Sequence, residues 1–118
     1  YYPIAFIGKE STASANAALC AAQADRFWPY HDLLFAQQGP ENSGYLSTAR
    51  LLSLGDQVGL GDGDFGVCVT SARNQRLVEQ TTDAASRKGI SSSPTVFVNG
   101  RKLASVTSAA VLAAIDAG

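Results

Sequence analysis

The pattern of apolar and polar positions predicts a short opening strand followed by a helix. Residues 1–7 form an apolar run that is typical of a β-strand. The alanine-rich stretch after the next turn predicts a helix over about 12–24, with Ser11 or Thr12 as its N-terminal cap. Small residues recur along one side of this stretch, so we expect a neighbouring element to pack closely against it.

The middle of the chain predicts further helices separated by turns. A helix is predicted over about 27–37, because bulky residues recur there at the spacing of a buried helical stripe. The residues of this stripe are Phe27, Tyr30, His31 and Leu34. Residues 38–44 are rich in turn-forming types and predict an exposed loop. Further helices are predicted after a cap at Ser47, around Cys68 and over about 73–88.

The pattern changes to strand and hairpin near the C-terminus. Residues 95–98 are β-branched or aromatic, and Asn99-Gly100 after them is a strong hairpin signal, with 101–105 as the returning strand. Thr107 is expected to cap a last helix whose inward-facing residues are Val111, Leu112 and Ile115. The order of elements predicts a mixed α/β domain with a helical insertion.

Composition limits the classes of protein that remain. The 118 residues are enough for one domain, and 46% of them are apolar, which excludes wholesale disorder. No apolar run reaches the ~18 residues that a membrane span needs. The net charge is −1 and Lys and Arg do not cluster, which argues against a nucleic-acid or anionic-membrane surface. The sequence has no Met and opens inside an apolar run, so we interpret it as the C-terminal portion of a longer protein.

The two cysteines leave two interpretations open. Cys20 and Cys68 are too far apart in sequence for a CxxC redox pair. They are either buried free thiols or a structural disulfide of an exported protein, which would stabilise the fold by roughly 4 kcal/mol. Catalytic use of either thiol is the least favoured reading, since apolar neighbours raise a thiol pKa.

The sequence does not predict a metal site. Two cysteines and one histidine make a poor metal site, and we expect none. Residues 61–64 look superficially like part of a calcium loop but lack the remaining ligands of that pattern. Asp62 or Asp64 is better explained as a helix cap.

Other chemistry-bearing side chains are expected to be structural. His31 is expected to pack or to lie at the surface, and Trp28 and Phe35 to belong to the core. No pairing of carboxylates for acid–base work is indicated. We expect the three glutamates to be solvated charges: Glu10, Glu41 and Glu79.

Three segments together resemble one known family. Residues 89–100, with the sequence GISSSPTVFVNG, look like the cis-proline segment of thioredoxin-fold proteins. Residues 27–35, FWPYHDLLF, and residues 2–6, YPIAF, narrow the resemblance to the DsbA-like disulfide oxidoreductases. It covers nearly the whole chain. It implies a thioredoxin-like core, formed by 1–7 and 90–118, with a mainly helical insertion over 11–88.

The resemblance also implies a site. In this family the proline that corresponds to Pro94 is cis, and the residue before it offers backbone groups to an extended substrate peptide. Ser93, Pro94 and Thr95 are therefore the expected substrate-binding residues. Cys20 and Cys68 are placed like the second, non-catalytic disulfide of some members. The family usually has Gly and then Thr or Val where this chain has Ser92 and Ser93, so the redox tuning of the site is open.

The largest departure is the catalytic motif. These residues contain no CxxC, so the domain is expected to be truncated at its N-terminus, with that segment upstream of Tyr1. The resemblance implies a parent enzyme that exchanges disulfides on cysteine-containing exported polypeptides with a redox partner protein, outside the cytoplasm and without a cofactor. The chain alone is expected to be redox-inactive. A truncated sheet also predicts domain swapping or a homodimer.

Two other functions remain as alternatives. The first is a peptide-binding or chaperone-like module that uses the same fold without a CxxC. The second is an isomerase or transferase that uses glutathione, although such relatives normally have a Val or similar residue before the proline and lack the second disulfide.

Overall fold

The computed structural model describes residues 1–61 and 63–118 of the chain. The Asp62 cap suggested by the sequence lies outside these residues. Within them the structure has six helices and two short strands. Their bounds are α1 Lys9–Gln23, α2 Phe27–Ala36, α3 Thr48–Gln57, α4 Asp64–Thr70, α5 Gln75–Arg87, β1 Phe97–Val98, β2 Arg101–Lys102 and α6 Ser108–Asp116.

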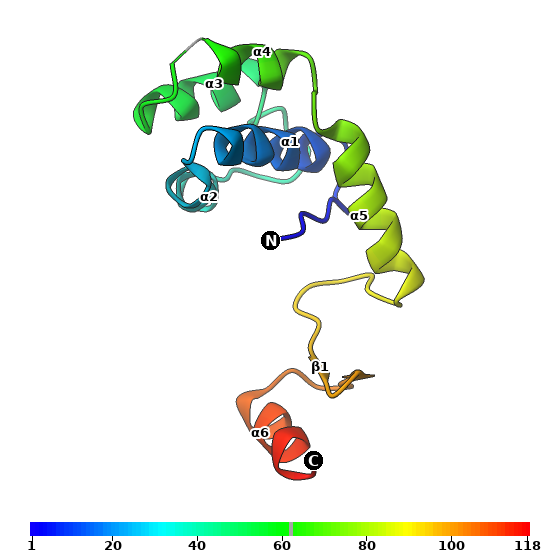
Figure 1. Ribbon diagram of the computed structural model, residues 1–118. Coiled ribbons are helices and arrows are strands. Elements are labelled where there is room, and N and C mark those ends of the chain that lie inside the picture. The colour runs from blue at the N-terminus through cyan, green and yellow to red at the C-terminus, as the bar shows by residue number, and fades with distance from the viewer. Residues whose placement is uncertain (62) are drawn as a thin grey trace.

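The first five helices form a helical body built around α1, which contacts each of α2, α3, α4 and α5 (Figure 1). Alanines on α1 make this possible, because their small side chains let other helices approach closely. Larger side chains from the surrounding helices fill the remaining space. The core consists of Ala17, Ala18, Cys20, Ala21, Tyr30, Leu34, Leu51, Leu54, Phe65, Cys68 and Val69.

A disulfide joins α1 to α4 inside this core. Cys20 and Cys68 are bonded, with 5.8 Å between their Cα atoms, and both residues are buried. The Asn74 side-chain amide donates to both sulfurs, at 3.6 and 3.5 Å, and the Asn74 backbone N–H donates to Asn16 Oδ1 at 2.7 Å. Of the two interpretations left open by the sequence, the structure has the disulfide and no free cysteine.

Side-chain caps begin two helices as the sequence predicts. Ser47 Oγ accepts the backbone N–H of Arg50 at 3.2 Å at the start of α3, and Thr107 Oγ1 accepts that of Ala110 at 3.2 Å at the start of α6. The cap predicted for α1 is wrong. That helix begins at Lys9, after Gly8 with a φ of 86°, so Ser11 lies inside its first turn.

Asp64 does not cap α4 either, because it is the first residue of that helix and its side chain accepts no N–H there. Its carboxylate instead forms two bonds with the Arg73 guanidinium, at 2.9 and 3.1 Å. The hydrogen bonds from Arg73, with its positive charge, hold the pKa of the exposed Asp64 carboxyl below its usual value. The pair links the first residue of α4 to the turn that follows the helix.

The hairpin predicted near the C-terminus is present but short. β1 pairs antiparallel with β2, with Phe97 opposite Lys102 and Val98 opposite Arg101. Asn99 and Gly100 between them have φ values of 48° and 80°, and a two-residue turn of this kind needs positive φ at both positions. α6 packs on β1.

The predicted opening strand is wrong. Residues 1–7 belong to no sheet, and the sheet of the described residues contains only β1 and β2. The segment runs along α5, where the Ala5 N–H donates to Thr82 Oγ1 at 3.0 Å and Thr81 Oγ1 donates to the Pro3 carbonyl at 2.5 Å. Its backbone groups are thus bonded by threonine hydroxyls in place of a neighbouring strand. The fold is mostly helical, with a small two-stranded sheet.

The expected inward face of α6 is wrong for Leu112 and Ile115, whereas Val111 is half-buried. Residues 90–118, here called the C-terminal unit, extend away from the helical body, and α6 has no buried residue (Figure 1). Leu112 is 60% exposed and Ile115 is 54% exposed. The radius of gyration is 16.3 Å, whereas a compact chain of this length has about 13.5 Å. α6 lacks a buried face because it packs only on the thin hairpin.

No helix within residues 1–61 and 63–118 is both long enough and apolar enough to cross a membrane.

Candidate functional site

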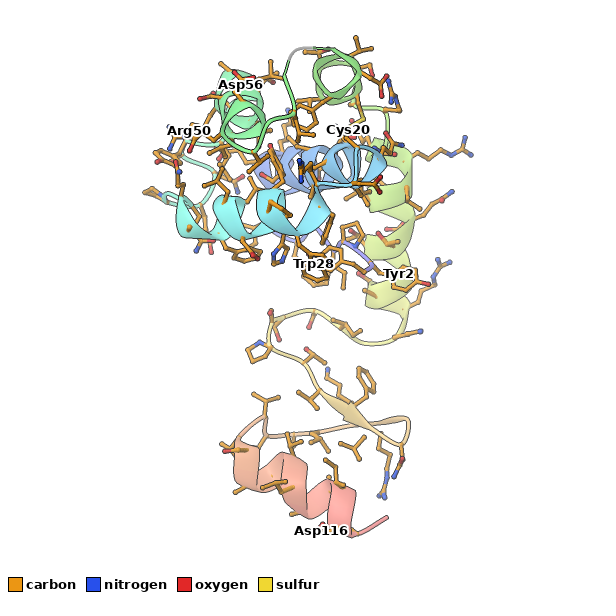
Figure 2. The ribbon with its side chains drawn as sticks, turned by 60° about the vertical axis from the view of Figure 1, so that its left-hand side comes forward. Tyr2, Cys20, Trp28, Arg50, Asp56 and Asp116 are labelled. Atoms are coloured by element: carbon orange, nitrogen blue, oxygen red, sulfur yellow. A yellow bond between two sulfur atoms is a disulfide. The ribbon has the colours of Figure 1, made fainter. Side chains whose placement is uncertain are left out.

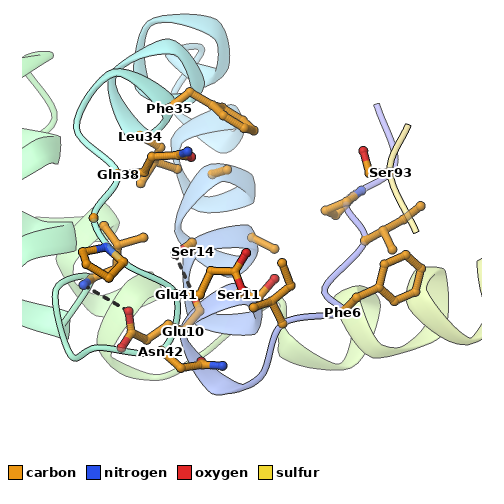
Figure 3. A pocket seen from close by; sticks show the side chains of 18 of the residues that line it. Phe6, Glu10, Ser11, Ser14, Leu34, Phe35, Gln38, Glu41, Asn42 and Ser93 are labelled. Carbon is orange, nitrogen blue, oxygen red and sulfur yellow. Dashed lines mark hydrogen bonds between the residues drawn. The ribbon is translucent and has the colours of Figure 1, made fainter. Parts of the chain in front are cut away.

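A pocket of about 450 Å³ lies where the helical body approaches the loop before β1 (Figure 3). Its walls come from the opening segment, α1, the end of α2, the loop after α2, and Ser93. Most of the lining is apolar. The residues that line it are Tyr1, Pro3, Ile4, Phe6, Ile7, Glu10, Ser11, Ser14, Ala15, Ala18, Leu34, Phe35, Gln38, Gly39, Pro40, Glu41, Asn42, Leu46 and Ser93.

The opening segment supplies one apolar wall through its extended backbone. Pro3 is buried and Ile4 and Phe6 are exposed, and all three line the pocket together with Tyr1 and Ile7. The two threonine bonds from α5 fix the segment on either side of Ile4. The apolar pattern that predicted a strand therefore marks a wall of the pocket.

The loop before β1 brings one of the three expected substrate-binding residues to the pocket. Ser93 lines it, while Pro94 and Thr95 do not. The peptide bond between Ser93 and Pro94 is cis. Thr95 Oγ1 donates to the Ser92 carbonyl at 2.6 Å and so fixes the loop locally. Within the described chain, neither the backbone N–H nor the carbonyl of Ser93 has a hydrogen-bond partner.

Glu10 is not the solvated charge that the sequence suggested. Its carboxylate accepts the backbone N–H of Gly44 and that of Leu46, the latter at 3.3 Å. These bonds hold the loop after α2 against the first turn of α1. A carboxylate is also favoured there by the helix dipole. No local sequence pattern predicts this contact, because Glu10 and Gly44 are 34 residues apart in the chain.

Glu41 extends from the same loop into the pocket, where Figure 3 shows its carboxylate near Ser11. It remains exposed, as the sequence suggested, and has neither a hydrogen-bond nor an ion-pair partner in the described part of the chain. None of the nine Lys and Arg residues lines the pocket. Sequence reasoning missed the role of both glutamates because the loop and α1 meet only in the folded chain.

A partly exposed aromatic patch continues from the pocket across α2. It consists of Tyr1, Phe27, Trp28, His31 and Phe35, with neighbouring ring centroids 4.7 to 6.2 Å apart. Trp28 is 60% and Phe35 62% exposed, so their expected place in the core is wrong. In Figure 2 Trp28 lies on the side of the helical body nearer the C-terminal unit.

The helical period explains this exposure. Tyr30 and Leu34 occupy the inner face of α2, and residues 28, 31 and 35 recur at i, i+3 and i+7 along a different face. A helix that is apolar nearly all round thus presents a second stripe, which the sequence already contained. His31 lies in that stripe, and its Nδ1 is 3.0 Å from Asp32 Oδ1.

The pocket offers apolar walls, Ser93 and the Glu41 carboxylate to a ligand. Both sulfur atoms of the chain are closed in the buried disulfide, away from the residues that line the pocket. Burial raises the pKa of the Tyr30 phenol well above its usual value, and its hydroxyl donates to the Leu51 carbonyl at 2.8 Å in the core. In the described residues no group of three or more His, Cys, Asp or Glu side chains is placed to hold a metal ion.

Comparison with known proteins gives the family. A family model described as thioredoxin matches residues 2–117. The chain belongs to the thioredoxin family. The match takes in both the pocket walls and the C-terminal unit, so the thioredoxin-like interpretation covers almost the whole length. Thioredoxin-family membership is compatible with a redox or disulfide function.

Two curated relatives resemble the chain, both from Salinispora. The Na⁺/H⁺ antiporter NhaA 3 of Salinispora tropica is 32% identical over 102 residues, which are 86% of this chain and 15% of that protein. The Na⁺/H⁺ antiporter NhaA 1 of Salinispora arenicola is 30% identical over 102 residues, with the same coverage. The thioredoxin-family chain thus spans about 15% of the length of these relatives. No solved structure matches the chain.

Proposed function

We propose that the chain is the substrate-holding part of a DsbA-like thiol–disulfide oxidoreductase. One observation carries the proposal: Ser93, whose backbone N–H and carbonyl are both unpaired, lines an apolar pocket. An extended peptide could bond both groups as a strand bonds a sheet edge, while its side chains enter the pocket. Thioredoxin-family membership supports this use of the loop.

The exchanging dithiol is proposed to lie in a CxxC segment outside these 118 residues. Cys20 and Cys68 cannot serve, because they are bonded to each other and buried. A substrate thiolate would attack a sulfur of the CxxC disulfide and form a mixed disulfide, with the other CxxC sulfur leaving as thiolate. The second substrate thiolate would attack the substrate sulfur of that mixed disulfide. The substrate is then oxidised by two electrons and the CxxC reduced.

The proposed substrates are cysteine-containing exported polypeptides, and the proposed location is outside the cytoplasm. The Cys20–Cys68 disulfide supports this location, since structural disulfides persist mainly in oxidising compartments. A redox partner protein would restore the CxxC disulfide after each cycle. The 118 residues alone are proposed to bind peptide without exchanging disulfides.

Three observations test the proposal. The gene sequence upstream of Tyr1 should encode a CxxC, and the complete gene product should oxidise a reduced, unfolded protein. The 118-residue chain should bind an extended peptide with a change in the fluorescence of Trp28, its single tryptophan. Ile4→Gln, at the pocket, should weaken that binding. Leu77→Gln is the control, since Leu77 is an exposed aliphatic residue of α5 away from the pocket.

The absence of a reactive thiol beside an open pocket favours one alternative, a peptide-binding or chaperone-like module. This function predicts that the complete gene product suppresses aggregation of an unfolded protein when all thiols are blocked. It also predicts no CxxC in the gene. Peptide binding without any oxidation activity in the complete product would establish this alternative and refute the oxidoreductase.

A further inference from the structure

The charges around the pocket are unevenly distributed. The chain contains three glutamates, and two of them, Glu10 and Glu41, line this pocket. The chain has nine basic and ten acidic residues. None of the nine basic residues lines the pocket. An apolar pocket in a nearly neutral chain therefore has a negative rim.

The carboxylates of Glu10 and Glu41 differ in their hydrogen-bond partners. Glu10 is occupied by two backbone N–H groups of the loop, although its negative charge remains. Glu41 is unpaired and extends from the loop into the pocket (Figure 3). An incoming ammonium or guanidinium group could bond the Glu41 carboxylate. An incoming carboxylate would instead be repelled by both glutamates.

The apolar walls determine which side chain of a bound polypeptide would lie near Glu41. Ile4 and Phe6 on one side and Leu34 and Phe35 on the other offer space for one large apolar side chain. The Glu41 carboxylate is on the loop at the border of the same space. A bound peptide that fills the apolar part therefore places a neighbouring side chain near Glu41.

We propose that this pocket selects polypeptide segments in which a large apolar side chain lies beside a Lys or Arg. The inference rests on the proposed function, since it names the substrate class of that same site. Glu41 is the residue that determines the preference, and the apolar walls supply binding that does not depend on charge. The preference weakens as salt rises, because exposed charges are screened.

The test uses two labelled peptides that differ at one position. Both contain a central Phe and no cysteine, and the residue after Phe is Lys in one peptide and Glu in the other. Fluorescence anisotropy gives the dissociation constants at low and high salt. We expect the Lys peptide to bind about fivefold more tightly at low salt, the scale of one exposed ion pair. The ratio should approach one at high salt.

Charge reversal identifies the residue responsible. Glu41→Lys should invert the preference, and Glu41→Gln should reduce it. Glu79→Lys is the matched control, because it makes the same change of charge at an exposed position of α5 outside the pocket. It should leave the ratio unchanged. Circular dichroism and an intact Cys20–Cys68 disulfide verify that each variant is folded.

The outcomes separate the inference from the proposed function. If both peptides bind equally to the unaltered chain and Ile4→Gln weakens both, the site stands and the charge preference is refuted. If neither peptide binds to the unaltered chain, the charge preference and the proposed function are both refuted. Equal effects of Glu41→Lys and Glu79→Lys would assign the preference to overall charge and overturn the role of Glu41. A dimer that dissociates in Glu41→Lys would make a second copy the occupant and overturn the inference.

Discussion

Two buried glycines in neighbouring helices should respond in opposite ways to the same substitution. Gly55 lies in α3 and Gly66 in α4. A Cβ atom at Gly55 would lie 2.9 Å from both Cδ1 and Cζ of Phe65, and closer still to Cε1. A Cβ at Gly66 would meet only Leu52, with Cδ2 at 4.0 Å.

The clash between a Cβ at Gly55 and Phe65 cannot be relieved by a small movement of the Phe65 ring, because that ring is itself tightly packed. Its ring lies against Tyr30, with ring centroids 5.5 Å apart, and the Tyr30 hydroxyl is bonded to the Leu51 carbonyl. Overpacking of a core costs about 1–3 kcal/mol. Replacing a helical glycine by alanine gains about 1 kcal/mol from helix propensity. We therefore expect Gly55→Ala to lower the free energy of unfolding by up to about 2 kcal/mol and Gly66→Ala to raise it by up to about 1 kcal/mol.

Urea denaturation followed by circular dichroism measures both changes. Thermal unfolding gives a second measure, since 1 kcal/mol corresponds to about 4 °C for a chain of this length. The two variants should differ by about 2 kcal/mol in stability. Equal stabilities for Gly55→Ala and Gly66→Ala would refute the packing of Phe65 against α3.

Three further predictions address the disulfide, the core and the loop. Replacing Cys20 and Cys68 together by Ala should lower the free energy of unfolding in urea by about 4 kcal/mol, through the entropy of the opened loop; an unchanged midpoint would contradict this. The raised pKa of Tyr30 means that the folded state holds that proton more firmly, so stability should fall as pH rises above about 10. Tyr30→Phe should reduce this decline in unfolding experiments at increasing pH, and an identical decline would exclude Tyr30 as its source. Glu10→Ala should accelerate amide hydrogen exchange at Gly44 in NMR spectra, and unaltered exchange would mean that the bond does not hold the loop.

Features that depend on neighbouring residues could be predicted from the sequence. The Ser47 and Thr107 caps each involve a bond to an N–H three residues ahead, and the Asn99-Gly100 turn depends on the φ values of two adjacent residues. Such interactions need no knowledge of the rest of the chain. The buried stripe of Tyr30 and Leu34 could also be predicted, because the helical period places both residues on one face of α2.

Features that depend on distant partners could not be predicted in this way. Residues 1–7 have the composition of a strand, but a strand needs a neighbour, and Thr81 and Thr82 supply bonds from α5 instead. The apolar residues of α6 were expected to face inward, yet the structure places no second layer against that helix. In both cases the local pattern identified the apolar side chains correctly, and their surroundings decided the outcome.

The site follows the same division. Ser93 was singled out by the resemblance of residues 89–100 to a known family, and that segment is contiguous in sequence. Glu41 and Ile4 reach the same pocket from segments that are far apart in sequence, so only the folded chain brings them together. The exchanging thiols of the proposed reaction lie on no residue of this chain, and the pocket accordingly has to be judged as a binding surface.

Helix α1 contributes residues both to the core and to the pocket. Ser11 and Ser14 lie on its pocket face, Ala17 and Cys20 belong to the core, and Ala18 belongs to both. The disulfide ties the core side of α1 to α4, so it also holds the helix whose other side is a wall of the pocket. A pocket whose wall is fixed in advance loses less conformational freedom when a peptide binds. The non-catalytic cysteines can therefore serve binding without touching the substrate.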